Sequence, residues 1–481
     1  MRNGGSGDFL HSGVFVDYCR NVTLSNNRIL NCRYGVYLFH SANNKLIKND
    51  ISMNYEDGLR LYYSRNTVLE GNTMVNNKYN FGVDGQNFAE FNHTIDASNL
   101  VDNRPILYRI GLSNEVFDSG IEVGTLCLIN ADNVTVKDLH VSGNGNGLLL
   151  WNATGSIVQN VTASSNNYGV VLRKSHGNVI RGNSCPDNWV GIFLEDSDGN
   201  IVEGNSVPSN EKGISLYNSD DNILRGNTAI DNLYGIRLFA SSSNKVYHNN
   251  WIENTEQIDL VNSHDNVLDD GSEGNFWSDY AGLDSNEDGL GDSAYDRGTT
   301  RDLYPLMGRF YEFQVATDRK GFHVQMICSS LVTGFNSKRT GDGDARIINF
   351  NVTNESGTPG FCRISIPTEF LSGPYLAKTY ESSWTNTPSG MLPGSNETRS
   401  LIYLNYESTI CSITIQGREP NPNRFPAIGV IALFAALLVG ALFLLHFAAK
   451  KRTTKAKIIK RCMISLASRQ PIFLKMERPR V

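Results

Sequence analysis

The stretch from Asn178 to Ser243 decides the fold, because it consists of three units of 22 residues: NVIRGNSCPDNWVGIFLEDSDG, NIVEGNSVPSNEKGISLYNSDD and NILRGNTAIDNLYGIRLFASSS. Asparagine opens every unit, and the same step continues to Asn244 and Asn266. Self-similarity at a fixed period is typical of a solenoid, in which each repeat packs only on its neighbours.

Apolar residues stand two positions apart in each unit, and this spacing predicts strands. Residues two apart point to the same side of a strand, whereas a helix would space them by three and four. The two columns are Val170, Ile192, Ile214, Ile236, Ile258 and Leu172, Leu194, Leu216, Leu238, Leu260. Two further apolar columns are Ile180, Val202, Leu224, Val246, Leu268 and Cys185, Val207, Ala229, Trp251. The sequence therefore predicts a parallel β-helix with Gly and Asn at its corners.

A leucine-rich repeat is the main alternative, since its range of lengths includes 22 residues. It would need an L-x-x-L-x-L run with one asparagine, and these units contain several asparagines and little leucine. The repeats fall into two blocks, about residues 10–80 and 130–270. We interpret residues 81–130, which lose the register, as one or two rungs that carry a protruding loop.

The C-terminal part of the sequence predicts a membrane anchor. Residues 425–449 contain no charge, and as a helix these 25 residues would span about 37 Å, more than the bilayer core of about 30 Å. Residues 450–481 contain eleven Lys or Arg and one acidic residue, so this tail carries +10 and the rest of the chain −16 of the net −6. The positive-inside rule places the tail in the cytoplasm and the acidic body outside, with 419–424 as a stalk.

The acidic body argues against nucleic acid as a partner and suits metal cations. The first residues lack the apolar run of a signal peptide, so we expect the natural start to lie upstream, with export by an unrecognised route as the alternative. One pair among Cys328, Cys362 and Cys411 could form a disulfide, and no CxxC motif occurs. Eight sequons on the predicted outer side suggest a glycoprotein, at Asn21, Asn92, Asn133, Asn152, Asn160, Asn351, Asn354 and Asn396.

Sugar cleavage requires paired carboxylates, or a carboxylate with a base, on one face. The weak candidates are Asp96, Asp102 and Arg104 in the 81–130 segment. Other acidic residues occupy strand-end corners, where they are ordinary turn residues: Glu195, Asp196, Asp198, Asp220 and Asp221. Arg181, Glu203 and Arg225 share an outward column and predict an exposed salt-bridge ladder.

Residues 284–292 read D-x-N-x-D-G-x-x-D, which matches the first part of an EF-hand loop. Its expected calcium ligands are Asp284, Asn286, Asp288, the backbone of Leu290, and Asp292. Position twelve is Tyr295 rather than Glu, so other residues would complete the site. We expect structural calcium in an acidic cap at 275–296, with a plain acidic turn as the alternative, and Trp277 and Tyr280 packed over the last rung.

The unit N-x-[IV]-x-x-N-x-[IV]-x-x-N-x-x-G-[IV]-x-[LF] resembles the NosD/CASH group of carbohydrate-binding and sugar-hydrolase repeats, over about residues 10–305. The insert HTIDASNLVDNRPILY is similar to an insert of that group, and FWSDYAGLDSNEDGLGDSAY resembles the cap of its membrane-anchored members. The resemblance implies a right-handed β-helix. It also implies copper-site maturation, but the nine histidines are dispersed and do not support copper.

We therefore expect an all-β chain with a right-handed parallel β-helix at 1–305. Residues 306–418 lack the period and alternate apolar with polar residues, which predicts a small β-sandwich, and one transmembrane helix follows. The favoured function is a non-enzymatic, membrane-anchored surface protein that binds carbohydrate or another envelope polymer. The alternative is a polysaccharide lyase or hydrolase that acts on extracellular glycans.

Overall fold

The computed structural model describes residues 11–298, 300–318, 320–340, 345–353, 360–379, 385–386, 398–406 and 410–418. These residues form strands and turns, with one short 3-10 helix, η2 (Phe88–Glu90). The predicted stalk, membrane segment and basic tail lie outside the described residues. Within the described part of the chain, no helix is long and apolar enough to span a bilayer.

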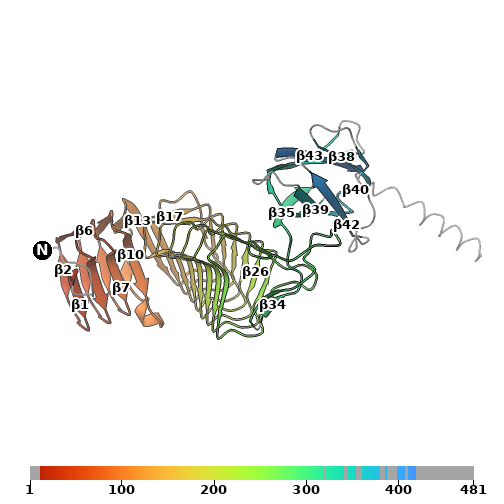
Figure 1. Ribbon diagram of the computed structural model, residues 1–481. Coiled ribbons are helices and arrows are strands. Elements are labelled where there is room, and N and C mark those ends of the chain that lie inside the picture. The colour runs from red at the N-terminus through yellow and green to blue at the C-terminus, as the bar shows by residue number, and fades with distance from the viewer. Residues whose placement is uncertain are drawn as a thin grey trace, which may run out of the picture. The chain divides into compact units, whose positions relative to one another are not determined.

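Residues 11–101 form a first solenoid block whose parallel strands stack in three rows (Figure 1). One row contains β1 (Ser12–Asp17), β4 (Tyr34–Phe39), β7 (Asp57–Tyr62) and β10 (Tyr79–Asp84). The second contains β2 (Thr23–Ser25), β5 (Lys45–Ile47), β8 (Val68–Glu70) and β11 (Thr94–Ile95). The third contains β3 (Arg28–Leu30), β6 (Asp50–Ser52), β9 (Thr73–Val75) and β12 (Leu100–Val101).

Residues 104–277 form a second block, again with three rows. The longest row contains β13 (Arg104–Ile110), β15 (Thr125–Ile129), β18 (Asn146–Trp151), β21 (Tyr168–Arg173), β23 (Val190–Glu195), β25 (Lys212–Tyr217), β28 (Tyr234–Phe239) and β31 (Glu256–Val261). The next contains β14 (Val116–Phe117), β16 (Thr135–Lys137), β19 (Ile157–Gln159), β22 (Val179–Arg181), β24 (Ile201–Glu203), β26 (Ile223–Arg225) and β29 (Lys245–Tyr247). The last contains β17 (His140–Ser142), β20 (Thr162–Ser164), β27 (Thr228–Ile230), β30 (Asn250–Ile252) and β32 (Phe276–Trp277).

The predicted columns of the 22-residue repeat are confirmed. Ile214 pairs with Ile192 on one side and with Ile236 on the other, and all three are fully buried in one core. At the corner, Asn200 Oδ1 accepts a hydrogen bond from the backbone N–H of Asn178 at 2.9 Å. Such buried amides satisfy backbone groups that the strands leave unpaired, so asparagine columns hold the corners.

Residues 81–130 contain rungs, as the sequence predicts: β10, β11 and β12 end the first block, and β13, β14 and β15 begin the second. The junction between the two blocks, which the sequence does not predict, lies among them. β12 pairs in parallel with β9 but antiparallel with β13. Asp102 and Asn103 form the two-residue turn between β12 and β13, with φ of 45° and 65°. Asp and Asn tolerate this left-handed conformation, which a tight hairpin requires at both positions. Through this hairpin the third row of the first block continues as the longest row of the second.

The first strands of the second block are buried on both faces. In β18, Leu148 and Leu150 point into the core of the second block, whereas Leu149 and Trp151 belong to the core of the first. Val171 of β21 repeats this division one rung later. Unbroken apolar strands are typical of sheets covered on both sides. The outer face of the second block therefore covers the core of the first.

Aromatic residues close the other end of the second block, as the sequence predicts. Trp277 is 1% exposed and stacks between Trp251 and Tyr295, with ring centroids 6.0 and 4.5 Å away. Tyr280 packs against the same cluster. A short hairpin of β33 (Tyr295–Arg297) and β34 (Thr300–Asp302) follows.

The described residues from 309 to 418 form two antiparallel sheets that share one apolar core. The first contains β35 (Arg309–Ala316), β36 (Gly321–Cys328), β39 (Gly360–Pro367) and β42 (Arg399–Tyr406). The second contains β37 (Leu331–Arg339), β38 (Ala345–Thr353), β43 (Ile410–Arg418), β40 (Ser372–Thr379) and β41 (Thr385–Asn386). A disulfide joins Cys328 to Cys362, so these two form the pair among the three candidate cysteines.

Candidate functional site

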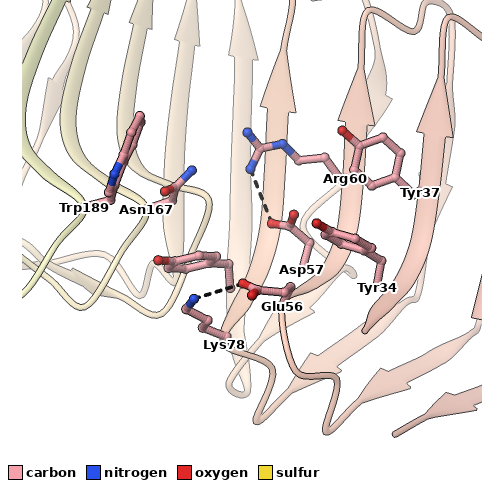
Figure 2. Close-up of a pocket in the computed structure, with 9 residues that line it drawn as sticks. Tyr34, Tyr37, Glu56, Asp57, Arg60, Lys78, Asn167 and Trp189 are labelled. Carbon is pink, nitrogen blue, oxygen red and sulfur yellow. Dashed lines mark hydrogen bonds and ion pairs between the residues drawn. The ribbon is translucent and has the colours of Figure 1, made fainter. Parts of the chain in front are cut away.

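An open pocket with a volume of about 390 Å³ lies at the junction of the two blocks (Figure 2). This volume falls within the range of small-ligand sites. The first block supplies most of its lining from β4, β7 and β10, and the second block supplies the opposite side. The lining residues are Tyr34, Tyr37, Glu56, Asp57, Arg60, Lys78, Tyr79, Asn167 and Trp189.

A chain of buried charges connects the pocket to the second block. Arg60 lies between two carboxylates, 3.3 Å from Asp57 Oδ1 and in an ion pair with Asp84. Arg173 Nη1 lies 2.7 Å from Asp84 Oδ1, and Arg173 Nε lies 2.7 Å from Glu195 Oε2. The side chains of both arginines are at most 10% exposed. An unpaired buried charge is costly. These five groups can lie here because carboxylates and guanidinium groups alternate along the network, so each charge has an opposite neighbour.

The pKa values of the three carboxyl groups in this charge network shift in different directions. Burial raises the pKa of Asp57, although Arg60 acts in the opposite direction. Burial also opposes the ionisation of Asp84, but the charges of Arg60 and Arg173 outweigh it and lower the pKa of Asp84. Burial raises the pKa of Glu195, partly offset by Arg173. Asp84, the carboxylate between two arginines, is therefore the most firmly ionised of the three.

Aromatic rings surround the charged chain on both blocks. Trp189, which is 37% exposed, packs edge-on against Tyr168 with centroids 5.3 Å apart. Lys212 Nζ lies 3.8 Å from the Trp189 ring centre, a cation–π contact that holds the indole in place. On the first block, Tyr37 contacts Tyr34 at 5.4 Å. The pocket thus combines exposed ring surface with carboxylates and basic groups.

Sequence analysis missed Asp57, Arg60, Asp84 and Arg173, and it assigned Glu195 to a turn. A signal was present for two of them, because Arg60 and Asp84 interrupt columns of aromatic side chains. Arg60 follows Phe15 and Tyr37 in one column, and Asp84 follows Phe39 and Tyr62 in the next. The pairing of Asp84 with Arg173 joins residues 89 positions apart, which the repeat pattern does not reveal.

The predicted catalytic candidates do not come together. Asp96 is exposed and accepts hydrogen bonds within its own turn from Ser98 and Asn99. Asp102 accepts them from the Asn76 backbone and, at 2.7 Å, from Asn80 Nδ2. Arg104 is exposed at the start of β13. Over the part of the chain that the structure describes, no hydrogen bond or ion pair links these three residues.

The acidic loop at 284–292 closes on its own backbone. The Asp284 carboxylate accepts N–H bonds from Asp288 at 3.0 Å and Gly289 at 2.9 Å. Asp292 Oδ2 accepts the Ser285 N–H at 2.9 Å, and Asp288 Oδ1 accepts that of Leu290. Burial raises the pKa of Asp284, against these backbone bonds. Within the described residues no three His, Cys, Asp or Glu side chains are grouped to hold a metal, so calcium here stays a prediction.

Two further predictions concern the surface of the solenoid: the salt-bridge ladder and the glycosylation sequons. Arg225 pairs with Glu203 at 2.6 Å, whereas Arg181 donates to Gln159 instead of extending the ladder. Six of the eight sequon asparagines lie in the described residues and all six are exposed; Asn354 and Asn396 lie outside them.

Two protein families match the sequence over the solenoid. "Right handed beta helix region" matches residues 7–125, and "Periplasmic copper-binding protein (NosD)" matches residues 112–282. This chain is a right-handed β-helix protein. The two matches overlap at residues 112–125, near the start of the second block. No curated protein matches the sequence.

Several solved structures are distantly similar to this β-helix protein. The A-module of an Azotobacter vinelandii mannuronan C-5 epimerase has 16% identity over 51% of this chain and 63% of that chain, with a TM-score of 0.26. A periplasmic alginate epimerase has 17% identity over 49% and 63%, with a TM-score of 0.27. The active domain of a bacteriophage CBA120 tailspike has 12% identity over 84% and 75%, with a TM-score of 0.24. The chain thus spans 63% of the length of the epimerases, and likeness this distant carries no information about function.

Proposed function

We propose that this protein binds carbohydrate in the junction pocket, and that residues 425–449 anchor it in the cell membrane with the solenoid outside. The observation that supports binding is the combination of exposed aromatic rings with charged hydrogen-bonding groups in one open pocket. Saccharides present apolar C–H faces that pack on aromatic rings, and hydroxyls that carboxylates and basic groups bind. Calcium in the 284–292 loop belongs to the same proposal, as a structural ion supported by the D-x-N-x-D-G-x-x-D spacing.

A glycan array with the purified full chain tests the binding proposal. We expect one class of glycan to bind, and Trp189→Ala to weaken that binding by about tenfold or more, because aromatic anchors dominate such sites. Leu233→Ala is the matched control: Leu233 stands two repeats further in the same column, is 42% exposed and does not line the pocket. Absence of binding to any glycan, or equal losses in both variants, would contradict the proposal.

A polysaccharide lyase or hydrolase is the second candidate, and Asp57 is the observation that favours it. Its buried carboxyl has a raised pKa and adjoins Glu56 at the pocket, and perturbed carboxyls in pockets are candidates for acid–base chemistry. Incubation of the bound glycan with the protein separates the two functions. Cleavage that disappears in Asp57→Asn supports an enzyme, whereas an intact glycan after long incubation supports binding alone.

A further inference from the structure

We infer that the junction pocket takes an uncharged saccharide and excludes uronates and other anionic sugars. This inference rests on the proposed function and names the ligand class of the same pocket. It follows from the pairing of the charged groups that line the pocket.

Both cations of the pocket are already engaged by carboxylates. Lys78 Nζ lies 2.9 Å from Glu56 Oε2, and Arg60 lies between Asp57 and Asp84. Recognition of a sugar carboxylate requires a basic group that can turn its donors to the ligand. A uronate would have to displace one of these carboxylates. Displacement from Arg60 would leave a buried charge without its partner, which is strongly unfavourable.

The balance of charge acts in the same direction. The four lining charges, Glu56, Asp57, Arg60 and Lys78, sum to zero. Behind them lie two carboxylates, Asp84 and Glu195, and one guanidinium, Arg173. The lining charges and these three groups together carry a net charge of −1. A like charge brought against such a site is unfavourable. An uncharged sugar avoids this cost and can still donate its hydroxyls to the lone pairs of Glu56 and Asp57.

Two further cations contact rings of lining residues without lining the pocket themselves. Lys212, against Trp189, is paired with Glu211 at 3.3 Å. The guanidinium carbon of Arg33 lies 5.3 Å from the Tyr34 ring centre, in a cation–π contact, and Arg33 is not a lining residue. Its charge therefore bears on the rim of the pocket and not on the paired groups inside. Arg33→Met removes this charge and leaves the lining unchanged.

Matched pairs of hexasaccharides test the inference with the full chain. The probes are hexasaccharides of mannose, glucose and galactose, each beside the uronate hexasaccharide of the same linkage, titrated by calorimetry at low and high salt. We expect the uncharged member of the bound pair to bind at least about tenfold tighter, with little salt dependence. Glu56→Gln releases Lys78 and should reduce the ratio of the two affinities, whereas Arg33→Met should leave this ratio unchanged.

The outcomes separate the inference from the proposed function. A uronate that binds as tightly as its uncharged counterpart, or tighter, would overturn the inference and leave carbohydrate binding intact. An unchanged ratio in Glu56→Gln would also overturn it, because Lys78 would then not be the masked cation. If neither member of any pair binds, the proposed function is contradicted and the inference with it.

Discussion

The carboxylate of Asp84 connects the two solenoid blocks. It pairs with Arg60 of the first block and with Arg173 of the second, and its side chain is 7% exposed. Both arginine side chains are buried, so solvent cannot take the place of that partner. The stability of the whole charge network therefore depends on this one carboxylate. An ion pair on the surface contributes less to stability, because solvent replaces a lost partner.

Asp84→Asn should lower the free energy of unfolding by about 3 kcal/mol, because it leaves two buried arginines short of negative charge. Urea denaturation of the two proteins measures the difference. Glu203→Gln is the control, since it breaks the partly exposed pair with Arg225 and should cost less than about 1 kcal/mol. Equal losses in both variants would show that the buried chain is no more important than a surface pair.

Asp302 should make the free energy of unfolding decrease as the pH rises. It is fully buried and accepts hydrogen bonds from Trp277 Nε1 and the Asn275 N–H, both at 2.8 Å, yet burial still raises its pKa to about 6. An unfolded Asp titrates near 3.9, so the folded state holds the proton more tightly. The contribution of Asp302 to stability is therefore complete below about pH 4 and is lost as the pH rises through 6.

Asp302→Asn should remove this decline, which urea denaturation at pH 4, 5, 6 and 7 would reveal as a flatter profile. Glu273 acts in the opposite direction and only at the acid end of this range. Burial would raise its pKa, but the hydrogen bond from His248 and the charge of Arg363 lower it to about 2, so its contribution is lost only below about pH 4.5. A variant with the same slope as the parent would exclude Asp302 as its source.

At the scale of elements, the strands of each rung are too short to be stable alone, and stacking on neighbouring rungs supplies what they lack. The last row of the second block shows how single residues limit an element. Between β20 and β27 this row is reduced to isolated bridges at Ser184 and Ser206. Pro186 and Pro208 follow these bridges, and proline has no N–H to extend the ladder. Apolar residues still fill this column, so the core continues where the strands do not.

The acidic loop at 284–292 is the element whose stability should respond to calcium. If the loop binds calcium, added ion should raise the melting temperature and chelator should lower it. A free concentration of 100 times the Kd would stabilise the protein by about 2.7 kcal/mol. The Asp284→Ala/Asp288→Ala variant should lose this response, and Asp17→Ala, an exposed acidic position in β1, should keep it. No effect of chelator on the unmodified protein would remove calcium from the proposal.

At the scale of the whole molecule, one sheet serves two cores. The outer face of β15, β18 and β21 packs against the first block, and their inner face lines the second. Further from the junction the same outer face carries polar residues in place of apolar ones. The column that holds Leu149 and Val171 near the junction continues to Phe193, Ser215 and Arg237.

Leu149→Ala should therefore lower the free energy of unfolding by about 2–4 kcal/mol, the usual cost of a cavity at a fully buried leucine. Arg237→Ala is the control in the same column, where it breaks a partly exposed pair with Asp259 and a cation–π contact with Tyr234, and it should cost less than about 1.5 kcal/mol. Urea denaturation measures both. A small effect of Leu149→Ala would show that the two cores do not depend on their shared sheet.

The sequence alone determined the local period, and with it most of the fold. A step of 22 residues fixes which side chains stack, so the buried columns, the asparagine corners and the aromatic cap over Trp251 could all be predicted. The tertiary structure alone decided the junction, where the hairpin at Asp102 and Asn103 starts a second solenoid. It also decided the pocket, because Asp84 and Arg173 meet only when the outer face of one block covers the core of another. A repeat reports contacts between neighbouring rungs, and it carries no information about contacts between blocks.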